Sequence, residues 1–161
     1  MYEPEFNKIT EKILNNRKFK KMKNVPHHYA TTRYAHNVEV AYKTFKIAKR
    51  LNLNYVDMTK AALMHDFYFD EDFSSRRKCF FNHAKISLKN ANKITKLNEI
   101  QENIIMSHMF PIGGKRPRYK ESIIVDFVDD IVSIKEISIG NLKYLNAAFL
   151  FMFIYIFNYL K

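Results

Sequence analysis

The apolar residues of this chain recur at intervals of three and four along most of its length. This spacing marks one face of an α-helix, whereas a half-buried strand alternates at every second residue. The 161 residues include 3 Gly and 4 Pro, which argues against a fold rich in loops and turns. With 47% hydrophobic residues, a chain of this length can bury a core. The sequence therefore predicts an all-α, single-domain helical bundle.

Short polar or proline-containing breaks separate the apolar stripes. The stripes predict helices at residues 4–21, 32–51, 55–65, 83–97, 98–108, 120–137 and 141–160. Residues 67–82 are aromatic and charged without a regular pattern, so we expect irregular structure there. We expect one domain over residues 1–161, made of a core at 25–137, a basic N-terminal helix at 4–23 and an apolar C-terminal helix at 141–160.

The longest apolar run covers the eleven residues 147–157. A helix that spans a membrane needs about 20 apolar residues. We therefore expect a buried core helix or a homodimer interface here, with a membrane-associated tail as the alternative. The charged N-terminus lacks the apolar stretch of a signal peptide. Together these features predict a cytoplasmic protein without a transmembrane span.

The positive charge is concentrated near the N-terminus. The formal net charge is +11, and residues 1–50 hold 12 basic and 4 acidic residues. The densest run is Arg17-Lys18-Phe19-Lys20-Lys21-Met22-Lys23. Such a run can bind a phosphate backbone or an anionic membrane, although a solvated helix end is the commoner structure. Nucleic acid therefore stays open as a partner without being favoured.

The six histidines are the most informative polar residues. The single cysteine, Cys79, excludes an internal disulfide and a four-cysteine zinc site. Imidazole and carboxylate groups together suit divalent Mn, Fe, Co or Zn. Asp66 directly follows His65 at the predicted end of a helix, where two successive side chains can face one cavity. His27 and His28 precede a helix cap, so we expect them at the surface or at a cavity rim.

Five segments occur in an order that resembles the HD-domain metal-dependent phosphohydrolase superfamily, over about residues 25–137. They are Arg33-Tyr34-Ala35-His36, Ala61-Ala62-Leu63-Met64-His65-Asp66, Asn82-His83-Ala84, Ile105-Met106-Ser107-His108 and Val125-Asp126-Phe127-Val128-Asp129. The two extra histidine segments are similar to those of binuclear members, which include diadenosine tetraphosphate hydrolases. The stretch from Pro117 to Ser122 also resembles one in small bacterial members.

The resemblance implies a metal site between helices and hydrolysis of a phosphate ester or anhydride through a metal-bound hydroxide. It implies two ions, with Fe, Mn, Co, Zn and Mg all open. The first ion would be held by His36, His65, Asp66 and Asp129, and the second by Asp66, His83 and His108. Asp66 would bridge the ions and, with His65, form the catalytic pair. Asp126 also matches the closing motif, and we choose Asp129 because valine or alanine usually precedes that aspartate in the family.

Two basic groups follow the implied ligands in the sequence. Arg76, Arg77 and Lys78 follow the His-Asp pair, and Lys115, Arg116, Arg118 and Lys120 follow His108. We expect both groups in loops at the rim of the site, where arginine suits bidentate contact with phosphate. The expected substrate is a small phosphorylated molecule, a nucleotide or similar. The alternatives are a nuclease acting on DNA or RNA and a non-catalytic module that binds nucleotides.

Overall fold

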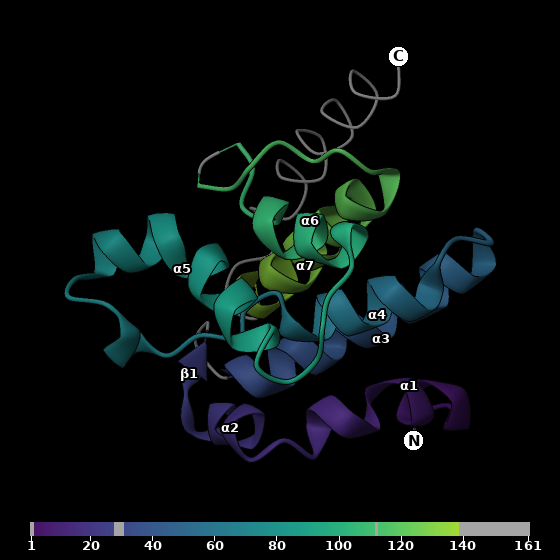
Figure 1. The fold of residues 1–161 in the computed structure, drawn as a ribbon, viewed down its shortest axis with the longest axis horizontal. Helices are drawn as coiled ribbons and strands as arrows, with labels where there is room; N and C mark the ends of the chain where they lie inside the picture. Colours follow the sequence, from purple (N-terminus) through teal and green to yellow (C-terminus); the bar gives the residue numbers. More distant parts are fainter. Residues whose placement is uncertain (1, 28–30, 112, 139–161) are drawn as a thin grey trace.

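The structure is a computed structural model that describes residues 2–27, 31–111 and 113–138 (Figure 1). Its α-helices within these residues are α1 (Pro4–Leu14), α2 (Arg17–Lys20), α3 (Arg33–Arg50), α4 (Tyr55–Met64), α5 (Arg76–Ala91), α6 (Glu99–Ser107) and α7 (Lys120–Ser138). Two 3-10 helices, η1 (Lys21–Asn24) and η2 (Asp70–Asp72), and two short strands, β1 (Pro26–His27) and β2 (Thr31–Thr32), connect them. The strands pair antiparallel. The predicted all-α fold is confirmed.

The helices α3 and α4 lie side by side at the centre of the molecule (Figure 1). The helix α1 packs against one side of this pair, and α6 and α7 pack against the other. The helix α5 completes the bundle through contacts with α6 and α4. Apolar side chains from all these layers are fully buried, including Phe6, Phe45, Leu63, Ile104 and Val128. This core fixes the five helices from α3 to α7 around one interior region.

Side-chain caps start several of these helices where the sequence predicts them. The hydroxyl of Thr32 accepts a hydrogen bond from the backbone nitrogen of Ala35 at 3.2 Å, which starts α3. The side chain of Asn98 accepts from the backbone of Gln101 at 2.9 Å, and the Gln101 side chain accepts in return from Asn98. This reciprocal pair is a capping box that starts α6.

The predicted helix at 4–21 is wrong in one respect, because it is broken at Asn15 and Asn16. The side chain of Asn16 accepts hydrogen bonds from the backbone nitrogens of Lys18 at 2.9 Å and Phe19 at 3.1 Å. Asparagine competes with the helical backbone in this way and favours caps. The chain therefore ends α1 at Leu14 and starts the separate helix α2 at Arg17.

The prediction for residues 67–82 is also wrong in part, because α5 begins at Arg76 and not at His83. The hydroxyl of Ser75 accepts a hydrogen bond from the backbone nitrogen of Lys78 at 3.2 Å and caps the helix. Arg76, Arg77 and Lys78 therefore lie in the first turn of α5 and not in a loop. Most residues of this turn are exposed, so it carries no apolar stripe that could reveal it.

The predicted C-terminal helix at 141–160 lies outside the described residues, as does the apolar run at 147–157 with its expected core or dimer role. Among the helices of the described ranges, none combines the length and apolar character needed to cross a membrane.

Candidate metal centre

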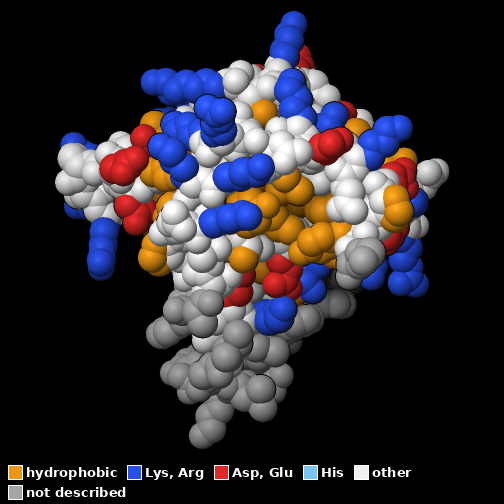
Figure 2. Space-filling view, turned by 90° about the horizontal axis from the view of Figure 1, so that it is seen from below, with side chains coloured by type: hydrophobic (Ala, Val, Ile, Leu, Met, Phe, Trp, Pro, Cys, Tyr) orange, Lys and Arg blue, Asp and Glu red, His pale blue; other side chains and the backbone are white. Residues whose placement is uncertain are grey.

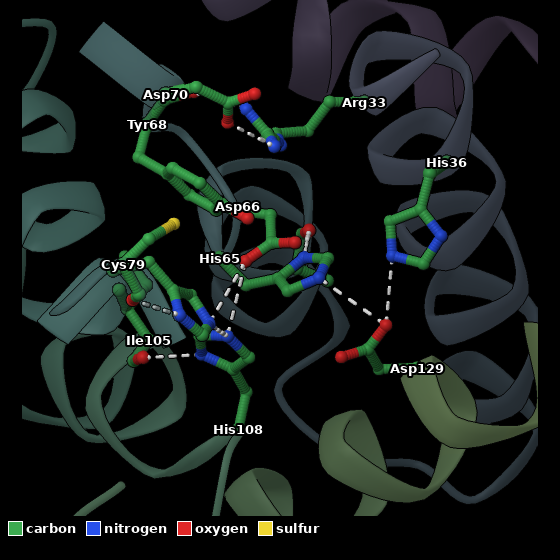
Figure 3. A network of polar contacts seen from close by, with 12 residues as sticks. Arg33, His36, His65, Asp66, Tyr68, Asp70, Cys79, Ile105, His108 and Asp129 are labelled. Carbon is green, nitrogen blue, oxygen red and sulfur yellow. Dashed lines mark hydrogen bonds and ion pairs between the residues drawn. The ribbon is translucent and has the colours of Figure 1, made fainter. Parts of the chain in front are cut away.

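The adjacent residues His65 and Asp66 lie immediately after α4, which ends at Met64. Both are buried, with His65 fully inaccessible. Because the chain leaves the helix here, the two side chains do not diverge around a helical axis. Both turn toward the interior region between the helices (Figure 3).

The first cluster consists of His36 from α3, His65 after α4 and Asp129 from α7. The Oδ1 atom of Asp129 lies 2.9 Å from Nε2 of His36 and 3.4 Å from Nε2 of His65. All three residues are buried, and their candidate ligand atoms lie within 4.8 Å of one another. The arrangement brings a carboxylate and two imidazoles to one point.

The second cluster consists of Asp66, His83 from α5 and His108, which follows α6. The Oδ1 atom of Asp66 lies 3.2 Å from Nε2 of His108 and 3.5 Å from Nε2 of His83. The two Nε2 atoms are 2.9 Å apart. Since Asp66 follows His65 in the chain, the two clusters are neighbours, and together they contain all six predicted ligands.

Backbone carbonyls fix the orientation of three of these imidazole rings. The Nδ1 atom of each ring lies beside a carbonyl oxygen within its own helix: His65 beside Ala62 at 2.7 Å, His83 beside Cys79 at 3.1 Å and His108 beside Ile105 at 2.7 Å. A carbonyl oxygen only accepts hydrogen bonds, so Nδ1 must carry the proton. In the neutral ring, Nε2 is then an unprotonated acceptor that points into the cluster.

The chemistry of the facing atoms fits a divalent cation in each cluster. The atoms His65 Nε2, Asp66 Oδ1 and Asp129 Oδ1 are shielded from solvent, and within the described residues they face imidazole nitrogens and carboxylate oxygens of the clusters. Acceptors that face one another in a buried place are costly unless a proton or a cation lies among them. Imidazole nitrogens with carboxylate oxygens are a usual ligand set for borderline divalent ions.

The electrostatics of the metal-free clusters also favour positive charge at these points. Burial lowers the pKa of His36, but hydrogen bonds to Asp129 and Glu136 outweigh burial and raise this pKa to about 10. Burial raises the pKa of Asp66, but the nearby histidines, His108 first, hold it well below its usual value. A bound cation can replace the proton that these carboxylates otherwise retain on the imidazoles.

Two residues near the clusters were not predicted as part of the site. Glu136 on α7 is buried, and its Oε2 atom lies 3.1 Å from Nδ1 of His36. The ring of His27 on β1 packs against that of His36 in a tilted arrangement with centroids 4.3 Å apart, and His27 forms a further group with His36 and Asp66 within 4.8 Å. Glu136 lies two helical turns after Asp129 on one face of α7, and this spacing is a signal that can find it. No comparable sequence signal marks His27.

The two candidates for the closing aspartate differ in position. Asp129 contacts both histidines of the first cluster, whereas Asp126 belongs to none of the candidate metal-binding groups of the described residues. Burial, followed by the charges of Asp130 and Asp129, raises the pKa of Asp126 to about 9. In the metal-free protein a carboxyl group with this pKa holds a proton at neutral pH.

The predicted basic residues do not form one rim. Arg76 lines a cavity together with His83 of the second cluster. Lys115, Arg116 and Arg118 line a separate cleft on another side of α5, together with Lys85. Arg77 and Lys120 are exposed on the first turns of α5 and α7 and line neither of these two spaces.

The basic N-terminal run lies on α2 and η1, and none of its residues belongs to the candidate metal-binding groups of the described residues. Its Lys18 donates a hydrogen bond to Asn90 at 2.9 Å, and Lys23 lies over the ring of Tyr34. Figure 2 views this side of the molecule and shows basic side chains spread around an apolar patch, with acidic groups between them. On the described part of this face they do not form the continuous stripe that tracks a nucleic-acid backbone.

The comparisons with known proteins agree with the geometry of the clusters. The family model described as HD domain matches residues 33–133, which contain all six residues of the two clusters. Neither a curated protein nor a solved structure matches the chain.

Proposed function

Since the chain belongs to the HD-domain family, we propose that it is a metal-dependent phosphohydrolase that cleaves a phosphate ester or anhydride of a nucleotide or a similar small molecule. Proteins with this domain are generally metal-dependent phosphohydrolases. The observation that carries the proposal is the pair of buried clusters, joined through the adjacent residues His65 and Asp66. A single structural metal site would need only one of them.

In this proposal each cluster would hold one divalent ion, and Asp66, which also groups with His36 of the first cluster, would be shared by the two ions. The first cluster offers two imidazoles and Asp129, and the second offers two imidazoles and Asp66. When bound, the ions supply positive charge for the phosphate oxygens and lower the pKa of a coordinated water toward neutrality. The ion identity stays open among Fe, Mn, Co, Zn and Mg.

The chain itself contributes ligands that are held in fixed orientations and shielded from solvent. The carbonyl oxygens of Ala62, Cys79 and Ile105 hold three imidazole rings in place, and Glu136 holds the fourth through Nδ1 of His36. Burial excludes bulk water and strengthens the attraction between these groups and a phosphate dianion. Ligands held in this way need no rearrangement as charge moves onto the phosphoryl oxygens.

The basic residues would bind different parts of the substrate. We propose that Arg76 contacts the part of the substrate that lies in the cavity beside the second cluster, because Arg76 and His83 line opposite ends of this cavity. Lys115, Arg116 and Arg118 would hold a further phosphate group in the separate cleft on another side of α5. Arg77 and Lys120 would add to the positive field around these spaces.

The test combines metal analysis with a substrate panel. The protein as purified should contain about two divalent ions per chain, and it should hydrolyse at least one of dinucleoside polyphosphates, deoxynucleotides, nucleoside monophosphates and cyclic dinucleotides. His65→Ala and Asp66→Ala should lose metal and activity together. Glu71→Gln is the matched control, because Glu71 is exposed on η2 and belongs to neither cluster.

Two outcomes would change the assignment. Full turnover by Asp66→Ala would contradict the proposal. Turnover of single-stranded DNA or RNA alone, with binding that weakens steeply between about 50 and 200 mM salt, would favour the nuclease alternative.

A further inference from the structure

A cavity of about 420 Å³ lies between the segment at 68–75 and the first turns of α5. Its walls are Tyr68, Asp70, Phe73, Ser74, Ser75, Arg76, Cys79, Phe80 and His83. Three of these side chains are aromatic, and polar groups lie among them. This combination of a flat apolar interior with a few polar groups is typical of small-molecule sites, and the volume is within their usual range.

The cavity extends along one face of α5 as far as the second cluster. Arg76, Phe80 and His83 lie on successive turns of this helix. With a rise of 1.5 Å per residue, the distance from Arg76 to His83 along the axis is about 10 Å. This is close to the length of a nucleoside 5′-phosphate, and His83 belongs to both the cavity and the second cluster.

The aromatic walls differ in how firmly they are held. Tyr68 is buried, with the Arg33 guanidinium 3.8 Å from its ring centroid and the His83 ring 5.0 Å from it. Arg33 is itself held by the Tyr68 carbonyl and by Asp70, both at 3.0 Å. Phe80, in contrast, is 44% exposed and lies at the edge of the cavity. An exposed aromatic ring at the edge of such a cavity is available to stack on a planar ligand.

We propose that this cavity binds the base of a nucleotide whose phosphate lies at the second cluster. The exposed Phe80 ring would stack on the base, and the side chains of Asp70, Ser74 and Arg76, at the end of the cavity away from His83, would face its polar edge. Aliphatic phosphates such as sugar phosphates lack the planar group that this ring recognises. The catalytic part of this inference rests on the proposed function, whereas binding of the base does not.

The first experiment measures binding without catalysis. Cys79 is the only cysteine of the chain and lines the cavity, so its reaction with a maleimide reports on occupancy. Adenosine and guanosine carry no phosphate for the metal ions, and either one should slow the labelling of the purified full-length protein. Ribose 5-phosphate at the same concentration should not slow it. Equal protection by ribose 5-phosphate, or no protection by any nucleoside, would overturn the inference.

The second experiment compares two neighbouring phenylalanines with the same exposure. Phe80 is 44% and Phe81 is 45% exposed, but only Phe80 lines the cavity. Stacking of an aromatic ring on a base contributes substantially to binding, so Phe80→Ala should weaken nucleoside protection of Cys79 at least about fivefold, while Phe81→Ala should not change it. Equal effects of the two substitutions would also overturn the inference.

The turnover of the two variants separates this inference from the proposed function. With the best nucleotide of the panel, the KM of Phe80→Ala should rise about fivefold or more, and the KM of Phe81→Ala should not. Nucleoside protection without any turnover would contradict the phosphohydrolase proposal and leave the base site supported. Turnover with equal KM in both variants would support the phosphohydrolase proposal and contradict the base site.

Discussion

At the scale of single residues, the groups behind the proposed ligands are as informative as the ligands. Glu136 is buried and accepts from Nδ1 of His36, whose Nε2 faces Asp129. Such a partner fixes the tautomer and the orientation of a metal-binding imidazole. The carboxylate therefore acts on the first cluster without belonging to it.

Glu136→Gln should weaken metal binding at the first cluster by about 10- to 100-fold, which is the usual effect of losing such a partner. The amide keeps the size of the side chain but removes its negative charge. Calorimetric titration of the metal-free protein with Mn²⁺ would measure the change. Glu121→Gln at the start of the same helix is the control, and an unchanged affinity in Glu136→Gln would contradict the positioning role.

Asp126 gives a prediction about the pH dependence of stability in the metal-free protein. Burial and two neighbouring aspartates raise its pKa from 3.8 to about 9 in the folded chain. Between these pH values the folded state holds a proton that the unfolded state has lost, so the free energy of unfolding falls as pH rises. Asp126→Asn needs no such proton and should remove this part of the decline.

Urea unfolding at about pH 5 and pH 8 with a chelator present would test this prediction. A change of one in a pKa is worth about 1.4 kcal/mol, so the variant should gain more than about 1 kcal/mol over the natural protein at the higher pH. A gain that is equal at both pH values would show that Asp126 is not the titrating group.

The sequence could identify the residues of the two clusters because their order in the chain is distinctive. It predicted His36, His83 and His108 together with the His65-Asp66 pair, and the structure brings them together. It could not identify the carbonyl partners, since every helix has such carbonyls and only the side-chain rotamer selects one. It also gave no reason to place His27 beside His36, because that contact depends on how the short strand β1 folds back.

At the scale of elements, the ends of helices place two of the four clustered histidines. His65 follows α4 and His108 follows α6, and each ring returns a hydrogen bond to the last turn of its helix. The position of His108 therefore depends on how the chain leaves α6. There the backbone nitrogen of Lys115 bonds to the carbonyl oxygen of Met106 at 2.8 Å, and the loop folds back over the end of the helix.

Gly114 makes this close return possible. A Cβ atom at Gly114 would lie 2.9 Å from the backbone nitrogen of Phe110 and 3.0 Å from the carbonyl oxygen of Met106. Gly114→Ala should therefore displace the loop and lower the free energy of unfolding by about 1–3 kcal/mol, the usual cost of overpacking. It should also lower the occupancy of the second cluster, measured as bound metal per chain, although no ligand is changed.

Gly113→Ala is the control for this prediction, because its nearest contact, 3.3 Å from the carbonyl oxygen of Phe80, is less severe. Thermal unfolding with and without metal would rank the two variants. If Gly114→Ala unfolds at the temperature of the natural protein, the loop does not control the end of α6.

The bounds of a helix could be predicted from the sequence where the apolar spacing and a capping residue indicate the same start. The bounds of α3, α4, α6 and α7 differ by one residue at most from those expected. The break between α1 and α2 was missed because apolar residues keep a helical spacing on both sides of Asn16. The side chain of Asn16 caps α2 at this point. The start of α5 was missed because its first turns lie over the cavity and carry no buried face to produce a stripe.

At the scale of the whole molecule, the clusters connect helices that are distant in the sequence. The first cluster joins α3, α4 and α7, and the second joins the end of α4 to α5 and α6. A metal ion in either cluster would therefore bind only the folded arrangement, because the unfolded chain does not bring these residues together. Ion binding and folding are then linked.

This linkage predicts a large effect of metal removal on thermal stability. A ligand at 100 times its dissociation constant stabilises the folded state by about 2.7 kcal/mol. For a chain of this size, 1 kcal/mol shifts Tm by about 2–4 °C, so each occupied cluster should raise Tm by on the order of 5–10 °C. Differential scanning calorimetry of the protein with a chelator, and again after Mn²⁺ is restored, would measure the shift.

Single-ligand variants assign this shift to the two clusters. Asp129→Asn removes a ligand of the first cluster only, and His83→Ala removes one of the second cluster only, so each should retain part of the metal-dependent increase in Tm. Asp66→Ala should retain the least, because its carboxylate groups with His83 and His108 of the second cluster and with His36 of the first. If the chelator leaves Tm unchanged and none of the variants differs from the natural protein in its response to Mn²⁺, the clusters do not bind metal ions, and the proposed chemistry fails with them.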